Sequence, residues 1–248
     1  AYGILEEGLM VKSFFDPAWM DLGILGTFGR WLDVNWVWTE MLIIYHAVFS
    51  ITIPIVLVEL AYLERENERW ISNRSLKVFI ALLVVVTAIG FLFLTSYAPP
   101  LPHYLLTILA MSLFIYIAYK LPTEKEKVES KNGKSKFLYI AGLAGTAAFF
   151  LIFWLGPYLF NHPIIVMAFG IALVFGMMKF LNRFDWKSPN SPLNRLAIVA
   201  GALSFLIVLT PLQELDATRQ DNPAGMTIVG LFAILGLLLL KSKLKARN

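Results

Sequence analysis

The chain contains no cysteine and few titratable residues of any kind. The absence of cysteine excludes disulfide bonds, thiol catalysis, iron–sulfur clusters and metal sites with thiolate ligands. Three histidines are too few to ligate several haems, and there is no CxxCH motif. The phosphate-binding loop, the dinucleotide fingerprint, the GxSxG elbow and the HExxH pair are also missing. The enzyme classes that depend on these motifs are therefore excluded.

Apolar residues dominate what is present. Of the 248 residues, 58% are hydrophobic and 15% are charged, and the mean hydropathy is +0.69, which is too apolar for an ordinary soluble domain. A helix crosses a bilayer with about 20 apolar residues, each rising about 1.5 Å. Seven runs have that length: 36–61, 76–97, 103–121, 137–159, 163–181, 193–212 and 225–240. We therefore predict an all-α polytopic membrane helical bundle over residues 35–248.

Two of these runs carry local signals. Gly142 and Gly145 in the fourth run, with small neighbours, favour close packing of that helix against another. Pro211 lies near the end of the sixth run and is expected to break the helix there, because proline lacks the N–H that the helix needs.

Residues 1–34 do not fit a conventional span, because charged residues recur along them. Asp16-Pro17 would interrupt a helix, and three glycines between residues 23 and 29 disfavour regular structure. We predict an interfacial or re-entrant segment tucked against the bundle. The chain opens AYGILEEG, without Met and without signal-peptide regions, as expected of a processed or partial sequence.

The basic residues predict an orientation. With seven spans, the loops after the first, third and fifth spans share a side with the tail, and this side holds every lysine and arginine except Lys12, Arg30 and Arg219. The positive-inside rule places that side in the cytoplasm and residues 1–34 outside. The net charge of +4 is thereby explained without a nucleic-acid partner. The expected partner is the bilayer of the plasma (cytoplasmic) membrane, with other membrane subunits or a homo-oligomer left open.

The first span differs from the others because it carries ionisable groups and a helix breaker. Such groups are costly at membrane depth and become functional-site candidates. His46 and Ser50 are four residues apart and share a helix face, and Pro54 should kink the helix beside them. Broken helices build ion and substrate sites in transporters. The leading hypothesis is a transporter-like or channel-like protein, or a membrane subunit of a larger complex, with a pathway along Glu40, His46, Ser50, Pro54 and Glu59.

The three histidines all fall on the predicted outer side, together with Glu40. Imidazoles and carboxylates at one level could bind zinc or another divalent metal, or could let a glutamate activate water. His46 and His103 are the candidate metal ligands, and a divalent metal is the one candidate cofactor. His103 and His162 also lie beside prolines at headgroup level, which is equally typical of interfacial residues. His46 could instead make a structural bond to a neighbouring helix.

Residues 3–50 contain a pattern of glutamates and histidine that points to a second hypothesis. Gly3-Ile4-Leu5-Glu6-Glu7 and His46 resemble the first two motifs of the CAAX-processing and bacteriocin-immunity class of intramembrane proteases, and His103 resembles the third. The resemblance implies that a glutamate activates water and that histidines complete the site. The alternative function is therefore a membrane-embedded metal- or glutamate-dependent hydrolase or protease, with Glu6, Glu7 and His46 as catalytic residues.

The chain also departs from that family's motifs. The arginine expected after the glutamates falls on Val11, with Lys12 one place further. Leu42 replaces a phenylalanine and Thr107 an asparagine, and the spans after residue 137 lie outside the resemblance. A purely structural subunit is the third hypothesis. Glutamates close to both His46 and His103 would favour the hydrolase, and a cavity from Glu40 to Glu59 would favour transport.

Overall fold

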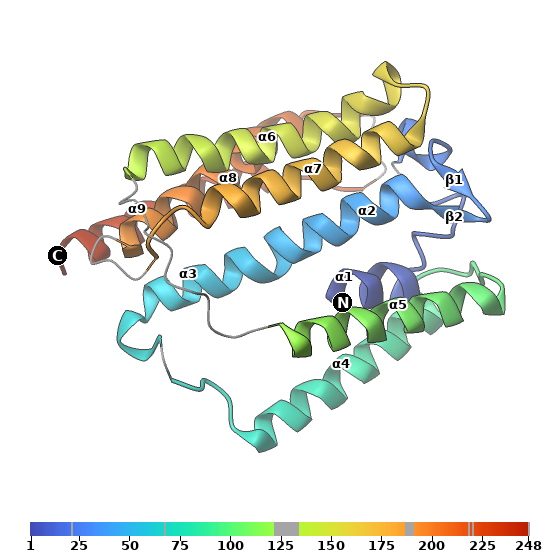
Figure 1. Ribbon diagram of the computed structural model, residues 1–248, viewed down its shortest axis with the longest axis horizontal. Helices are drawn as coiled ribbons and strands as arrows, with labels where there is room; N and C mark the ends of the chain where they lie inside the picture. Colours follow the sequence, from blue (N-terminus) through green and yellow to red (C-terminus); the bar gives the residue numbers. More distant parts are fainter. Residues whose placement is uncertain are drawn as a thin grey trace. The chain divides into compact units, whose positions relative to one another are not determined.

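Seven long apolar helices make up most of the described chain (Figure 1). The computed structural model describes residues 1–20, 22–66, 68–121, 134–186, 191–217, 219 and 221–247. Each predicted span is confirmed as a helix of spanning length and composition. The first is continuous over Trp36–Ala61, and the others are α4 (Asn73–Phe93), α5 (Leu101–Lys120), α6 (Ser135–Leu159), α7 (Pro163–Leu181), α8 (Ser191–Glu214) and α9 (Met226–Lys245).

The predicted orientation rests in part on basic residues about which the structure says nothing. Lys125, Lys127, Lys131 and Lys187 lie outside the described residues.

The expected break at Pro211 was wrong, because α8 continues through this residue to Glu214. Proline cannot donate to the carbonyl of Ile207, four residues earlier. The hydroxyl of Thr210 donates to that carbonyl instead, at 2.8 Å. One lost backbone bond near the helix end is therefore replaced by a side-chain bond.

The chain forms two compact units. The first consists of Ala1–Ile51, Asn67–Lys125 and Phe160–Met167, and it contains the N-terminal segment, α2, α4 and α5. The second consists of Thr52–Glu66, Glu126–Leu159 and Ala168–Asn248, and it contains α3, α6, α8 and α9.

The N-terminal segment is more ordered than the glycines suggested. It consists of α1 (Tyr2–Ile4), the π-helix η1 (Leu5–Met10), the 3-10 helix η2 (Gly23–Gly26) and a hairpin of β1 (Arg30–Trp31) with β2 (Val34–Asn35). The two turn residues of the hairpin, Leu32 and Asp33, have φ values of 50° and 57°, as a type I′ turn requires. The side chain of Asn35 then accepts a bond from Trp38 N, so the hairpin leads directly into α2 (Trp36–Tyr45).

The segment is attached to the first unit by a small apolar core and one arginine. Phe14, Phe15 and Val34 pack with Leu42 of α2. The Arg30 guanidinium donates to the carbonyls of Phe15, at 2.8 Å, and Asp16, at 3.2 Å. In consequence η1 packs against α4 and α5, and α1 against α2 and α5.

In the second unit, α6 and α8 touch through their backbones. A Cβ at Gly142 would overlap the carbonyl of Ile198, and a Cβ at Gly201 would overlap the carbonyl of Tyr139. The two helices run parallel, since Ser135 bonds to Asn194 near both starts and Phe150 stacks on Phe205 further along. The close packing predicted from Gly142 is therefore confirmed.

The last helix, α9, runs antiparallel to α8. Gly230, near its start, lies against Thr210, and Leu244, near its end, packs with Leu196. Leu60 of α3 (Ile53–Ala61) completes this core cluster.

The long helices leave much of their apolar surface exposed. Only 6% of the most apolar stretch of α4, and 6% of that of α5, is buried within the chain. A soluble protein does not leave apolar surface of this extent in water, whereas a bilayer accepts it. The described helices thus indicate a multi-pass membrane protein.

Candidate functional site

Two π-helical turns of the first unit carry the candidate site. In η1, Val11 N donates to the carbonyl of Glu6, five residues earlier, at 2.8 Å. The second, η3, covers His46–Thr52, and α3 restarts at Ile53 with Pro54 in its first turn. Pro54 would clash with the carbonyl of Ser50 in a regular α-helix, and a wider turn accommodates it. Such π-turns are frequent at functional sites.

Glu6, Glu7 and His46 come together at these turns. Nε2 of His46 lies 3.1 Å from Oε1 of Glu7, and Nδ1 lies 3.4 Å from Oε2 of Glu6. Potential ligand atoms of the three residues all lie within 4.8 Å of one another. Nδ1 also lies 2.9 Å from the hydroxyl of Ser50, one turn further along η3. Each nitrogen of the imidazole therefore faces a carboxylate.

A glycine makes this approach possible. The ideal Cβ of Gly3 would lie only 3.0 Å from Cβ and Cδ2 of His46, so a larger residue there would press on the ring. The rings of Tyr2 and Tyr45 meet the imidazole edge-on, both at 5.6 Å between centroids. His46 is 7% exposed as a result. The imidazole is therefore held in one orientation by packing as well as by polar contacts.

Glu7 is further fixed by a chain of hydrogen bonds. The indole N–H of Trp38 donates to Ser13 Oγ at 3.1 Å, and the Ser13 hydroxyl donates to Oε2 of Glu7 at 2.5 Å. Ser13 is fully buried. Glu7 thus has one oxygen on Ser13 and the other on His46.

Glu6 is held less completely. Its Oε2 is buried and has no hydrogen-bond partner among the described residues, although it lies near the imidazole. Burial, followed by the hydrogen bond with Glu6 and the charges of both glutamates, raises the pKa of the neighbouring Tyr2. The site therefore contains one constrained carboxylate and one with an unsatisfied oxygen.

Two contacts hold η1 on its neighbours. Gly8 lies against Thr107 of α5, whose Cγ2 would be 2.6 Å from an added Cβ. Lys12, with φ of 62°, ends the turn and extends its amine to α4. Nζ donates to the carbonyl of Phe91 at 2.9 Å and to that of Thr95 at 3.1 Å, at the C-terminal end of the helix where a cation is favourable. Burial lowers the pKa of this amine.

The charges of the cluster favour a cation. Among the described residues, the ion-pair partner of Glu6 and Glu7 is His46. One imidazole can carry at most one positive charge, whereas two carboxylates can carry two negative charges. The side chains of Glu6 and Glu7 are partly buried, at 26% and 13% exposed, and like charges in such positions are costly unless they are paired. Two carboxylates and an imidazole are suitable ligands for Zn²⁺ or Mn²⁺, and three protein ligands leave a position for water.

The other sequence-predicted residues lie elsewhere. His103 Nε2 lies 3.0 Å from the carbonyl of Leu32, and its ring packs on Phe15. Glu40 is six residues before His46 on the same helix, and both of its carboxylate oxygens are buried without a partner among the described residues. His103 as a metal ligand and Glu40 as a pathway residue therefore stay predictions.

The later part of the predicted pathway, in chain order, belongs to the second unit. Pro54 and Glu59 lie on α3. Glu59 lies 3.6 Å from Arg195 of α8, which also makes a bidentate contact with Glu66. This arrangement gives Glu59 a structural partner within its own unit.

Sequence reasoning missed the residues that support the cluster. Ser13, Gly3 and Gly8 carry no signal of their own, because these residue types occur throughout loops and helices. Trp38 stands at the start of a span, where tryptophan is typical of the membrane interface, so its sequence position does not indicate a contact with Ser13. Thr107 entered as a departure from a family motif, and it lies against the residue that follows Glu7.

Comparison with known proteins assigns neither a family nor a function to this chain. The chain matches no protein-family model, no curated protein and no solved structure.

Proposed function

We propose that this protein is an integral membrane hydrolase that binds a divalent cation through Glu7 and His46, with Glu6 beside the cation as the base that activates water. The observation that carries the proposal is the contact of both carboxylates with the two nitrogens of one buried imidazole. The cation would lower the pKa of a bound water and so supply hydroxide near neutral pH. The proposed orientation, with the cytoplasmic C-terminus, places this site at the outer side of the membrane.

The two glutamates have different roles in this proposal. Glu7 is the fixed ligand, because Ser13 and His46 hold both of its oxygens. Glu6 is the base, because its buried Oε2 has no hydrogen-bond partner among the described residues. Glu6 takes a proton from water, and the hydroxide adds to the carbonyl carbon of an ester or peptide bond. The tetrahedral intermediate then collapses, the bond to the leaving oxygen or nitrogen breaks, and Glu6 returns the proton to the leaving group.

Metal content of the detergent-purified protein is the first test. We expect about one divalent ion per chain in the wild type, and its loss in His46→Ala and Glu7→Gln. Glu40→Gln is the matched control, since it makes the same substitution as Glu7→Gln at a carboxylate with buried oxygens that lies outside the cluster. The absence of stoichiometric metal from the wild type, after loading with Zn²⁺ or Mn²⁺, would refute the metal site.

Hydrolysis is tested separately in proteoliposomes. The probes are a quenched fluorogenic transmembrane peptide and a fluorogenic fatty-acyl ester, added to metal-loaded protein. We expect cleavage of one probe by the wild type, and none by Glu6→Gln although this variant keeps its metal. Retention of full activity by Glu6→Gln would remove Glu6 as the base, and metal binding without cleavage of either probe would argue against a hydrolase.

Cation transport along the first span is the second candidate, and Glu40 is the observation that favours it. Neither carboxylate oxygen of Glu40 has a partner among the residues that the structure describes, and an ionisable group at membrane depth is costly and therefore a functional-site candidate. This candidate predicts that proteoliposomes pass protons or Na⁺ and that Glu40→Gln abolishes the flux. The hydrolase proposal predicts no flux from the wild type.

A further inference from the structure

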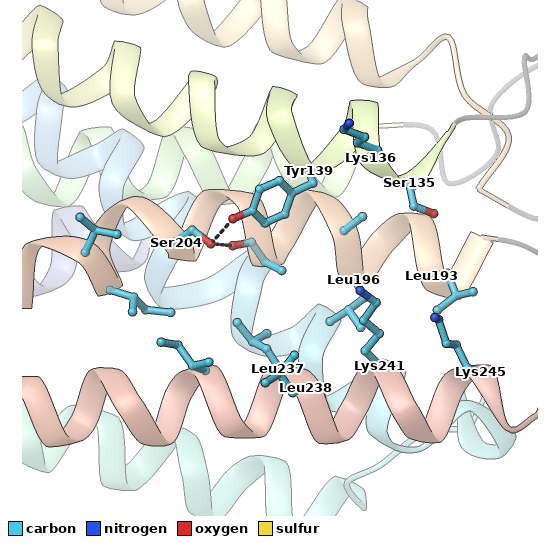
Figure 2. Close-up of a pocket in the computed structure, with 15 residues that line it drawn as sticks. Ser135, Lys136, Tyr139, Leu193, Leu196, Ser204, Leu237, Leu238, Lys241 and Lys245 are labelled. Carbon is cyan, nitrogen blue, oxygen red and sulfur yellow. Dashed lines mark hydrogen bonds between the residues drawn. The ribbon is translucent and has the colours of Figure 1, made fainter.

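A groove in the second unit, far along the chain from the glutamate cluster, combines an apolar floor with a basic end. It has a volume of about 690 Å³ and lies between α6, α8 and α9 (Figure 2). Such a volume is within the range of about 300–1,000 Å³ typical of ligand sites. Leucine, isoleucine, valine and alanine side chains of α8 and α9 form most of its lining.

Three lysines gather at one end of this groove. Lys136 is in the first turn of α6, and Lys241 and Lys245 are in the last turns of α9 (Figure 2). None of the described residues that line the groove is acidic. The N-terminal ends of α6 and α8 lie at this same end, because the two helices run parallel. The C-terminal end of α9 lies there too and its dipole opposes theirs, so the three lysines supply the positive charge of this end.

The other end of the groove suits a hydrocarbon chain. Its lining residues extend along α8 from Leu193 to Val208, which is about 22 Å at 1.5 Å per residue. That length equals about half of a bilayer of 40–45 Å including headgroups. The polar groups inside the groove are satisfied, since Tyr139 and Ser204 hydrogen-bond to each other at 2.9 Å and Ser204 donates to the carbonyl of Ala200.

We propose that this groove binds one anionic phospholipid, with its phosphate headgroup at Lys136, Lys241 and Lys245 and an acyl chain along α8. The basic end of the groove suits the phosphate headgroup, and the apolar floor suits an acyl chain. The length of the groove matches one leaflet of the bilayer. In the orientation proposed above, the lysines lie at the cytoplasmic face and the lipid comes from the inner leaflet. The site is independent of the glutamate cluster and of the hydrolase proposal.

The first experiment measures the headgroup preference. Full-length protein in mild detergent is titrated with phosphatidylglycerol, or with phosphatidylcholine of the same acyl chains, and bound lipid is counted by native mass spectrometry. We expect the wild type to retain one phosphatidylglycerol at least tenfold more tightly than phosphatidylcholine. Equal retention of the two lipids would overturn the proposal.

A triple variant tests the lysines. Lys136→Gln/Lys241→Gln/Lys245→Gln should weaken phosphatidylglycerol binding about tenfold or more, since each basic residue near a membrane surface contributes appreciably. The control is Lys77→Gln/Lys120→Gln/Lys179→Gln, which removes the same charge from exposed positions outside the groove. An equal loss in the control would mean that general surface charge, and not this groove, attracts the lipid.

A bulky substitution in the groove tests whether an acyl chain binds along α8, because it leaves all three lysines in place. Ala200→Phe inserts a ring into the lining and should weaken both lipids, whereas Ala172→Phe, at an exposed position of α7, should weaken neither. Unchanged phosphatidylglycerol binding by Ala200→Phe would overturn the proposal. Circular dichroism of each variant separates loss of the site from loss of the fold.

Discussion

Nε2 of His46 lies 3.1 Å from Oε1 of Glu7, a residue 39 positions earlier in the chain. The contact joins a π-helical turn in the N-terminal segment to a π-helical turn in the first long helix. Widening a turn changes the direction of every following side chain, so the two turns together decide where these groups point. The pair is therefore the centre of the candidate site.

Gly3→Ala should disturb this pair without removing any of its members. The added Cβ would lie 3.0 Å from two atoms of His46, so the imidazole must shift by a few tenths of an ångström, which alters its contact with Glu7. Overpacking of this kind costs about 1–3 kcal/mol, so we expect roughly tenfold weaker metal binding and a lower unfolding temperature. The control, Gly236→Ala, adds a methyl group to α9 with nothing within 4 Å. Metal affinity equal to that of the wild type would show that the cluster does not depend on the position of the imidazole.

Gly201→Ala should destabilise the second unit. Its Cβ would overlap the backbone carbonyl of Tyr139, and a backbone atom cannot rotate away as a side chain can. We expect the free energy of unfolding to fall by about 3 kcal/mol or more, as α6 and α8 are forced apart. Helix propensity alone would favour alanine over glycine by about 0.5–1 kcal/mol.

The sign of the change in the free energy of unfolding therefore shows whether backbone overlap or helix propensity dominates. Gly236→Ala, on α9 and with no described atom within 4 Å of the added Cβ, should show the favourable propensity effect, measured by denaturant unfolding in the same detergent. A gain of stability in Gly201→Ala would mean that the two backbones are not in contact.

The seven helices were predictable because length and hydropathy are properties of consecutive residues. The close packing of α6 was also predictable, since glycines such as Gly142 leave room for a backbone. Pro211 was misjudged because the hydroxyl of Thr210 takes over the bond that proline cannot make. That compensation depends on one rotamer, which the sequence does not specify.

The candidate site was predictable only in its residue types. His46 was singled out because an ionisable group in an apolar span is costly, whereas Glu6 and Glu7 were singled out because they resemble a family motif. Their contact, and the separation of His103 from them, depend on how the N-terminal segment folds back on α5 and α2. Gly8 and Lys12 contribute to that packing through their contacts with α5 and α4, and nothing in their local sequence indicates the helix that each will meet.

The stability of the first unit should depend on pH through Lys12. Burial lowers the pKa of its amine below the ordinary value of 10.5, against a smaller opposing effect of Asp16. Between the lowered pKa and 10.5, the unfolded chain binds more protons than the folded chain. The free energy of unfolding therefore rises with pH across this window, and the contribution is smallest where the buried amine is fully charged.

Lys12→Met should remove this slope. The difference between wild type and variant, measured by denaturant unfolding from neutral pH to pH 10.5, isolates Lys12 from the tyrosines that titrate nearby. Lys77→Met, which alters an exposed lysine of α4, should keep the wild-type slope. Parallel curves for the wild type and Lys12→Met would mean that the amine is not buried when the chain is folded.

The absence of cysteine makes the proposed orientation directly testable, because a single introduced cysteine is the only thiol in the chain. Met20 in the N-terminal segment is 53% exposed, and Ala246 follows the last helix and is also exposed. A membrane-impermeant maleimide should label Met20→Cys in intact cells, and should label Ala246→Cys only after permeabilisation.

The reverse pattern would place Glu6, Glu7 and His46 on the cytoplasmic side, and the three lysines of the groove on the outer side. The positive-inside rule would then fail for a chain whose basic residues are strongly segregated. The glutamate cluster and the lipid groove would survive such a result, because each depends on contacts within its own unit. Only the direction from which each site receives water, substrate or lipid would change.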